Sequence, residues 1–307
     1  MTQQETPRIK HLVIYPVKST AGIEVPNATI TEDGLVIGQY KDHQFMIVRA
    51  EADESGIYNF ITQRDKRNKE DNPQGLSALA LVKPRFIDDV LELTWRHESP
   101  ITVPADRNHG KELAVRIWDD TCYAVDQGDG LAEWLSDHLH LPVRLVKAEG
   151  SFSRMSRQNY VANSNPVRFQ DGYPIHWFAI ESVDELSQIA GQTIPWQSFR
   201  PQMVTEGTQP QFEHKIYSGQ IAGIPFIDPK PCDRCPVTLV NQETGEVRKK
   251  EPLQSLSKYK KWRNRDGDLK VIFGENMLPL GRGKITIGDE LVVSTYRNPQ
   301  LVYGKNV

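Results

Sequence analysis

Short apolar stretches separated by turn residues dominate the first half of the chain. Their β-branched and aromatic content favours β-strands, and turn dipeptides such as Asp33-Gly34 and Asn72-Pro73 stand between them. We predict strands over residues 9–15, 44–49, 76–82, 90–95 and 113–117. The same pattern returns near the end of the chain, over residues 284–287 and 291–294.

A helical period appears in three later segments. Leu131, Trp134, Leu135 and Leu139 share one face of a helix that opens at the acidic Asp129.

Two more helices are predicted, one from a capping motif and one from the spacing of its apolar residues. The sequence SVDE at 182–185 reads as a capping box with Ser182 as the N-cap. From about residue 252, apolar residues recur every three positions as far as Trp262 and predict a third helix.

Many short strands with few helices predict a mixed, mainly β (α+β) fold with two β-barrel-like units and a few helices. We place the boundary where the first helix and its following strand close one unit, giving domains 1–148 and 149–307. No Gly-rich phosphate-binding motif follows a strand, so neither a Rossmann nor a P-loop fold is indicated.

Composition narrows the class of protein. Hydrophobic residues make up 38% and charged residues 25% of the 307 positions, which is typical of a globular chain. No apolar run reaches the roughly 20 residues of a membrane span, and the polar N-terminus does not resemble a secretory signal. A net charge of −3 argues against a nucleic-acid partner, and three cysteines are too few for a disulfide framework. We therefore expect a cytoplasmic protein.

The most informative short motif is Cys232-Asp233-Arg234-Cys235, flanked by prolines. A neighbouring guanidinium favours the thiolate, the form of cysteine that binds metals or attacks electrophiles. A zinc site would need two further ligands, and a redox dithiol would be expected beside a βαβ unit, which the sequence around the motif does not suggest. All three interpretations stay open from spacing alone.

Two further motifs suit an anion. A strand ending in Tyr15-Pro16 delivers Lys18 and Ser19 into a turn, although a solvated turn lysine fits equally well. Arg200, held extended before Pro201, could clamp an anion or pair with a surface carboxylate.

The order of the motifs carries more information than any one of them. YPVKS is followed by ITQR, FQDGYP, FRP and CDRC, and then by TG, EPL and a closing GKITIGDEL. This order resembles the MOSC family (molybdenum cofactor sulfurase C-terminal domain) with its N-terminal β-barrel partner, and in particular the amidoxime-reducing component proteins and their bacterial counterparts. The resemblance runs from about Ile9 to Val293. It implies that about the first 45 residues could pack with the MOSC barrel.

The resemblance implies a molybdenum–molybdopterin (Moco) oxidoreductase that reduces N-hydroxylated compounds. Cys235 would be the metal ligand and catalytic residue, with Arg234 beside it lowering the pKa of its thiol, and Cys232 would be a structural thiol. The implied cofactor-binding residues are Lys18, Ser19, His43, Ser182, Arg200, Gln202, Asp233 and Arg234.

Two of these positions depart from the family pattern. His43 stands where the family has a cofactor-contacting arginine, so one fixed positive charge is replaced by a side chain that is mostly neutral at pH 7. Gln202 replaces an asparagine and is one methylene longer.

Electrons are expected from a separate donor protein, a reductase or an iron–sulfur protein, because no cysteine follows Cys235. The basic segments 248–250 and 258–265 could dock an acidic donor or be the solvated face of a helix. Two other functions stay open: a sulfur carrier or transferase with a persulfide on Cys235, and a binding module in which the cysteines hold a structural ion or nothing.

Overall fold

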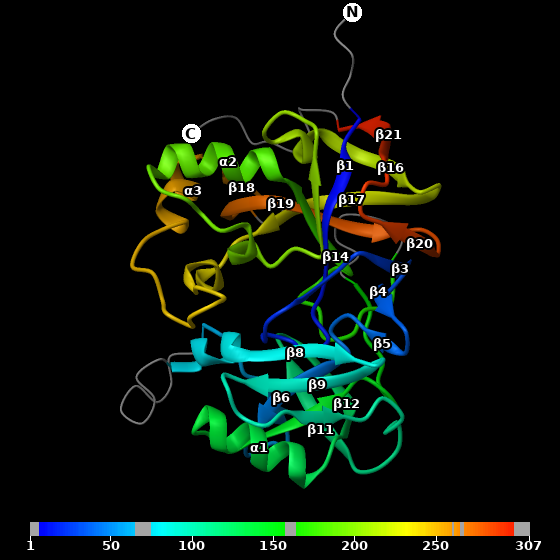
Figure 1. Ribbon diagram of the computed structural model, residues 1–307, viewed down its shortest axis with the longest axis vertical. Helices are drawn as coiled ribbons and strands as arrows, with labels where there is room; N and C mark the ends of the chain where they lie inside the picture. Colours follow the sequence, from blue (N-terminus) through cyan, green and yellow to red (C-terminus); the bar gives the residue numbers. More distant parts are fainter. Residues whose placement is uncertain (1–5, 65–74, 157–163, 260, 265–266, 298–307) are drawn as a thin grey trace, which may run out of the picture.

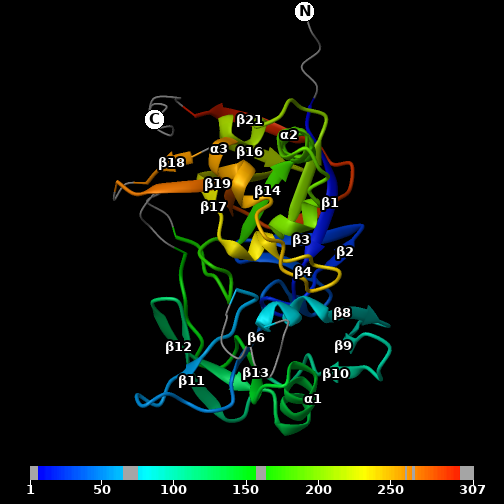
Figure 2. The same ribbon diagram turned by 90° about the vertical axis from the view of Figure 1, so that its left-hand side faces the viewer.

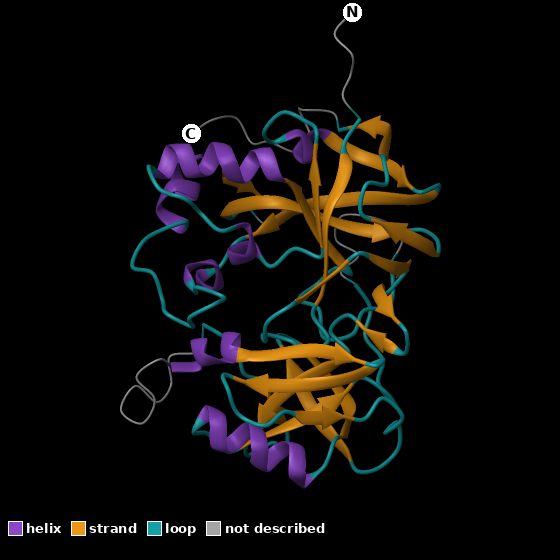
Figure 3. Cartoon of the chain, in the orientation of Figure 1, coloured by secondary structure: helices purple, strands orange, loops and turns teal. Residues whose placement is uncertain are grey.

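The protein is described by a computed structural model covering residues 6–64, 75–156, 164–259, 261–264 and 267–297 (Figure 1). Two units lie one above the other in this view, and strands dominate both (Figure 3). We call the strands β6 to β13 with their helices the N-terminal unit, and all other elements the C-terminal unit.

The C-terminal unit is built on a nine-stranded sheet with the order β2-β1-β15-β14-β19-β17-β16-β21, in which β18 pairs with β19. A β-bridge joins Arg8, in the first strand, to Glu290, the residue directly before the last strand. The sheet is therefore nearly closed. Its strands are β1 (Arg8–Ile14), β2 (Ile23–Val25), β14 (Ile175–Ala179), β15 (Met203–Glu206), β16 (Ile216–Ile221), β17 (Ile224–Asp233), β18 (Lys261–Arg263), β19 (Leu269–Pro279) and β21 (Leu291–Tyr296).

A four-stranded sheet, β20-β3-β4-β5, completes this unit. It consists of β3 (Asn27–Thr31), β4 (Gly34–Ile37), β5 (Tyr40–Lys41) and β20 (Gly283–Thr286). Strands from the first 41 residues therefore pair with strands from the last third of the chain. The division of the chain after residue 148 stays a prediction.

The N-terminal unit holds a five-stranded sheet, β6-β13-β12-β11-β7, and a three-stranded sheet, β10-β9-β8. A bridge from Val48 to Phe60 links the two edges of the five-stranded sheet. The strands are β6 (Phe45–Arg49), β7 (Tyr58–Asn59), β8 (Val82–Ile87), β9 (Val90–Trp95), β10 (Ile101–Val103), β11 (Glu112–Ile117), β12 (Asp120–Asp126) and β13 (Val143–Lys147). Helix α1 (Asp129–Leu139) buries Leu131, Leu135 and Leu139 in the core of this unit.

Two further α-helices belong to the C-terminal unit and lie close together in both views (Figures 1 and 2). Helix α2 (Ile180–Ala190) connects β14 to β15, and these two strands are parallel. The chain thus contains a βαβ unit that its sequence pattern did not suggest. Helix α3 (Leu253–Tyr259) packs near it through Leu256, in a core with Phe178, Phe199 and Phe273.

The mainly β fold with a few helices is confirmed, as is the helix that opens at Asp129. The predicted strands over 9–15, 44–49, 90–95 and 113–117 correspond to β1, β6, β9 and β11 within a residue or two. No helix in the described ranges is long and apolar enough to cross a membrane.

The predicted strand over 76–82 is wrong. Residues Gly75–Leu81 form the 3₁₀-helix η1, and only Val82 begins a strand. The segment from Leu76 to Val82 is buried at every position, and a continuous apolar run does not distinguish a strand from a buried helical turn.

The capping box at Ser182 is also wrong. The N-cap is Ala179, three residues earlier, and Ser182 lies inside the first turn of the helix. Its Oγ donates to Glu213 Oε2 at 3.0 Å and accepts the Gln211 N–H at 2.7 Å, so it serves a tertiary contact and not the helix end.

The third helix ends earlier than predicted. It stops at Tyr259, and Trp262 lies in β18, where it pairs with Lys270 of β19. The basic segment 258–265 is therefore not one helix face, and positions 260, 265 and 266 lie outside the described residues.

A buried polar cluster lies within the large sheet. Glu275, fully buried, accepts from His214 Nδ1 at 2.6 Å and from Arg297 Nη2 at 2.5 Å. Asp228, also fully buried, accepts from Trp177 Nε1 at 3.1 Å through Oδ1, whereas its Oδ2 has no partner. Burial and the nearby Glu275 carboxylate raise the pKa of Asp228 well above its usual value, although Arg297 opposes this.

We predict that Asp228→Asn gains stability relative to the wild type as the pH rises from about 4 to about 8. A raised pKa in the folded state means that the wild type loses free energy of unfolding once the pH passes the unfolded-state pKa of about 3.9, whereas the amide does not titrate. Thermal unfolding of both proteins across this pH range measures the difference in their stability.

The control is Asp129→Asn, because hydrogen bonds from Arg144 lower the pKa of that exposed carboxyl. Its contribution is complete above the unfolded-state pKa of about 3.9, so this variant should keep a nearly constant stability difference from the wild type over the same range. Parallel pH curves for Asp228→Asn and the wild type would contradict the raised pKa.

Candidate functional site

One cavity lies between the two units and collects most of the predicted site residues. Its lining includes Lys18, Ser19, His43, Arg200, Gln202, Asp233, Arg234 and Cys235. Ser182 is not part of this lining, since its side chain is buried against Glu213 in the C-terminal unit. The N-terminal unit contributes Thr62, Gln63, Arg64 and Trp118 to the other wall.

The topology brings the motifs together. The Lys18 turn follows β1, and the cysteine motif ends β17 and continues into the 3₁₀-helix η5 (Pro236–Leu239). Arg200 follows the 3₁₀-helix η3 (Trp196–Phe199), just before β15, which pairs with β1. Residues far apart in sequence thus meet at one place because their strands belong to one sheet.

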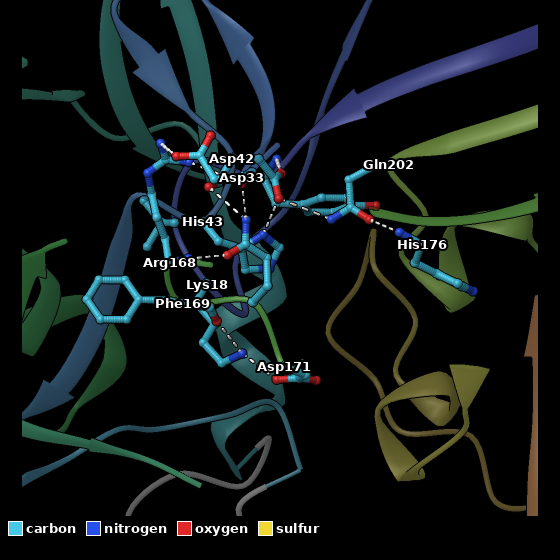
Figure 4. A network of polar contacts seen from close by, with 12 residues as sticks. Lys18, Asp33, Asp42, His43, Arg168, Phe169, Asp171, His176 and Gln202 are labelled. Carbon is cyan, nitrogen blue, oxygen red and sulfur yellow. Dashed lines mark hydrogen bonds and ion pairs between the residues drawn. The ribbon is translucent and has the colours of Figure 1, made fainter. Parts of the chain in front are cut away.

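Lys18 is buried, with only 6% of its side chain exposed. Its ammonium donates to the Phe169 carbonyl at 2.8 Å and to Asp171 Oδ1 at 2.5 Å (Figure 4). Burial lowers the pKa of Lys18, while the charge and hydrogen bond of Lys18 hold the pKa of Asp171 below its usual value against the effect of burial. The interpretation as a solvated turn lysine is wrong.

Asp171 also contacts the N-terminal unit. Its Oδ1 also accepts from Trp118 Nε1 at 2.9 Å, so it links the two units. The segment that carries it is fixed by Arg168, which pairs with Asp33 in the turn between β3 and β4 (Figure 4).

The two departures from the family pattern meet at one carboxylate. Asp42 is fully buried, and its Oδ2 lies 2.5 Å from His43 Nδ1 and 3.2 Å from Gln202 Nε2 (Figure 4). Gln202 Oε1 in turn accepts the backbone N–H of His176 at 2.8 Å. His43 and Gln202 are therefore held by a common support.

The guanidinium of Arg234 bonds Cys232 and Phe199, whereas the sequence led us to expect that it would act on the Cys235 thiol. Its Nη1 donates to Cys232 Sγ at 3.0 Å, and its Nη2 donates to the Phe199 carbonyl at 2.8 Å. Burial raises the pKa of the Cys232 thiol, and Arg234 counteracts this. His176 lies 3.4 Å from Arg234 Nη1, and burial together with this cation lowers its pKa well below the usual value, so its ring is neutral at pH 7.

Arg200 is not extended as predicted, since its φ of 53° lies in the left-handed region. Its guanidinium carbon lies 4.3 Å from the centroid of the Tyr15 ring. Its Nη1 donates to Gln242 Oε1 at 3.0 Å, whereas its buried Nη2 has no hydrogen-bond partner. Arg234 Nε is likewise buried without a partner. Unpaired guanidinium donors beside a cavity are suited to a phosphate or carboxylate group.

The lining carries more positive than negative charge. Lys18, Arg64, Arg200 and Arg234 are cationic, against the carboxylates of Asp171 and Asp233. Asp233 is in addition paired with Lys230 at 2.8 Å. The cavity is therefore suited to an anionic ligand.

A zinc site at the two cysteines finds no support in this arrangement. Among the residues that the structure describes, no three His, Cys, Asp or Glu side chains are grouped so that they could hold a metal ion. Neither Cys232 nor Cys235 forms a disulfide bond.

Comparison with protein families gives two matches. Residues 6–142 match the MOSC N-terminal beta barrel domain, and residues 164–292 match the MOSC domain. The chain belongs to the MOSC family. The resemblance seen in the sequence is thereby confirmed.

Named relatives fall into two groups. Mitochondrial amidoxime-reducing component 1 is 27% identical in Mus musculus and 25% in Homo sapiens, and each alignment covers 93% of this chain and 82% of the relative. The molybdenum cofactor sulfurase of Drosophila melanogaster is 30% identical over 85% of this chain. This chain spans 31% of that relative's length.

The sequence did not identify several lining residues. Gln63 and Arg64 belong to the ITQR motif that supported the MOSC resemblance, but no role was assigned to them. Trp118 follows β11, and Asn276 lies inside β19, where nothing in the local pattern marks them as site residues. The contact between the two units brings Gln63, Arg64 and Trp118 to the cavity, whereas the pairing of β19 with β14 and β17 brings Asn276.

We predict that Asp171→Asn lowers the melting temperature by a few degrees at pH 7, because Lys18 loses its charged partner. Since the pKa of Asp171 is lowered by folding, its contribution is complete above the unfolded-state pKa of about 3.9 and declines as the pH falls below that value. The difference from the wild type should therefore shrink in acid, as measured by thermal unfolding.

Asp184→Asn, at an exposed position of α2, is the control and should change little at any pH. A difference between Asp171→Asn and the wild type that persists unchanged at acidic pH would contradict the ion pair.

Proposed function

We propose that this protein is a Moco-dependent oxidoreductase that reduces N-hydroxylated compounds, such as amidoximes and N-hydroxylamines, to amines. The observation that carries the proposal is the cavity itself, in which the Cys235 thiol lies among cationic side chains from both domains. Relatives named amidoxime-reducing components, similar over most of their length, support the same reaction.

The residues fit the cofactor chemically. A thiolate at Cys235 is a soft ligand that suits molybdenum, and Lys18, Ser19 and Arg200 would hold the phosphate of the pterin. The unpartnered Arg200 Nη2 and Arg234 Nε would gain acceptors from such a group. When bound, the cofactor would supply the two-electron chemistry that cleaves the N–O bond.

The protein's own residues would position the side chains of the cavity wall and enclose the ligand. Asp42 holds His43 and Gln202 in fixed orientations at the cavity wall. Asp171 bonds both Lys18 of the C-terminal unit and Trp118 of the N-terminal unit, and so joins the two sides of the cavity. The overall reaction consumes two electrons and two protons for each N–OH group and releases water.

We propose that a separate protein delivers the electrons. Lys249, Lys250, Lys258, Lys261 and Arg263 are exposed on the segment after the cysteine motif and would attract an acidic donor. Arg248 contributes less to this surface, because its guanidinium donates to Ser198 Oγ at 3.0 Å.

A sulfur carrier is the second candidate function. It is favoured by the 30% identity to a molybdenum cofactor sulfurase over most of this chain. In this role Cys235 would carry a persulfide, and a partner protein would have to load it.

We predict that the wild type, expressed in a host that makes the cofactor, contains nearly stoichiometric molybdenum. Cys235→Ser should reduce this content by about tenfold or more, because the thiolate ligand is lost. Cys232→Ser is the matched control and should keep the metal. Elemental analysis and assay with an amidoxime give the readout.

Folded wild type without molybdenum would overturn the oxidoreductase proposal. Cyanide-releasable sulfur on such a protein, lost in Cys235→Ser and retained in Cys232→Ser, would favour the sulfur carrier instead.

A further inference from the structure

We infer that Gln63 and Gln242 form a positioning pair that orients Arg200 and the Ser19 turn toward the anionic group of the ligand. The inference rests on the proposed function only in taking that group to be a phosphate. One member comes from the MOSC N-terminal domain and the other from the MOSC domain. We call them the glutamine pair.

The glutamine pair forms a continuous chain of hydrogen bonds. Gln63 Nε2 donates to the Ser19 carbonyl at 2.7 Å and to Gln242 Oε1 at 3.1 Å. Gln242 Nε2 donates back to Gln63 Oε1 at 2.9 Å. Gln242 Oε1 also accepts from Arg200 Nη1 at 3.0 Å, so the chain ends on the guanidinium.

The partners at the two ends fix the orientation of both amides. A guanidinium can only donate, so Gln242 must present its oxygen to Arg200. A carbonyl can only accept, so Gln63 must present its nitrogen to Ser19. With these ends set, the two amides pair with each other in one arrangement, and Gln63 is only 3% exposed.

The choice of an amide has a consequence for charge. A carboxylate at position 242 would form an ion pair with Arg200 and compete with the anionic ligand for the guanidinium. An amide oxygen orients the same guanidinium without neutralising it. Arg200 thus keeps both its charge and its unpartnered Nη2 for the ligand.

The other end of the chain supports a strained turn. Ser19 has a φ of 69°, in the left-handed region, which is unfavourable for a non-glycine residue. The hydrogen bond from Gln63 to its carbonyl helps to hold this turn, which also places Lys18.

The loop that carries Gln242 is itself attached to the MOSC N-terminal domain. Ser77 Oγ donates to the Gly245 carbonyl at 2.6 Å, and Lys83 pairs with Glu243 at 2.9 Å. The glutamine pair is therefore the inner part of a contact between domains, so the anion site depends on how the two domains meet.

The test uses full-length protein made without the cofactor and inorganic pyrophosphate as the probe, measured by calorimetry. Gln242→Ala should weaken pyrophosphate binding by about tenfold, which corresponds to one hydrogen bond to a charged group. Gln63→Ala should also weaken it, and the double variant should lose no more than Gln242→Ala alone, because the two residues act as one unit.

Gln242→Glu provides a second readout. It keeps an oxygen beside Arg200 but adds a negative charge, so pyrophosphate binding should fall by at least about tenfold with little change in melting temperature. Gln127→Ala is the matched control, because Gln127 is a buried amide of the MOSC N-terminal domain that bonds the Val125 carbonyl and does not line the cavity. It should lower the melting temperature and leave binding unchanged.

Wild-type affinity in Gln242→Glu, additive losses in the double variant, an equal loss in Gln127→Ala, or no binding by the wild type would each overturn the inference. Pyrophosphate binding is measured on cofactor-free protein. A negative result for the glutamine pair is therefore distinguishable from the absence of molybdenum in the protein.

Discussion

The burial of Arg200 and Arg234 against neutral hydrogen-bond partners is the constraint on which the site depends. Arg234 donates to the Phe199 carbonyl, and Arg200 donates to the Gln242 amide. Lys18 has a carboxylate partner, but it too donates to a carbonyl, that of Phe169. Neutral oxygens offset part of the desolvation of a cation and leave its charge uncancelled. An anionic ligand would therefore neutralise positive charge that the protein's own groups leave uncompensated.

The nine-stranded sheet of the C-terminal unit makes this gathering possible. Strand β1 lies between β2 and β15, so the turn after β1 and the segment before β15 open toward the same side. The long pair β17 and β19 brings the cysteine motif to that side as well. The MOSC N-terminal domain then covers the opening with Gln63, Arg64 and Trp118.

Local patterns in the sequence predicted those parts of the fold that depend on local physics. Alternating apolar residues marked β9 and β11, and the period of Leu131 and Leu135 marked α1. Ser182 and Trp262 were misplaced because tertiary contacts to Glu213 and β19 outweigh a capping motif and a spacing of three. The order of motifs indicated Lys18, Arg200 and Cys235. No local pattern reveals the contacts of Asp42 with Gln202 or of Gln242 with Gln63 and Arg200, because these partners are distant in sequence.

The pairing of β1 also sets an order of events during synthesis. Strand β1 ends at Ile14, and its partner β15 begins only at Met203. The strands between Phe45 and Lys147 pair with one another and are complete before β15 leaves the ribosome. The first strand must therefore wait, with one edge unpaired, while the inserted unit folds, and an edge exposed for so long during synthesis is open to pairing with another chain.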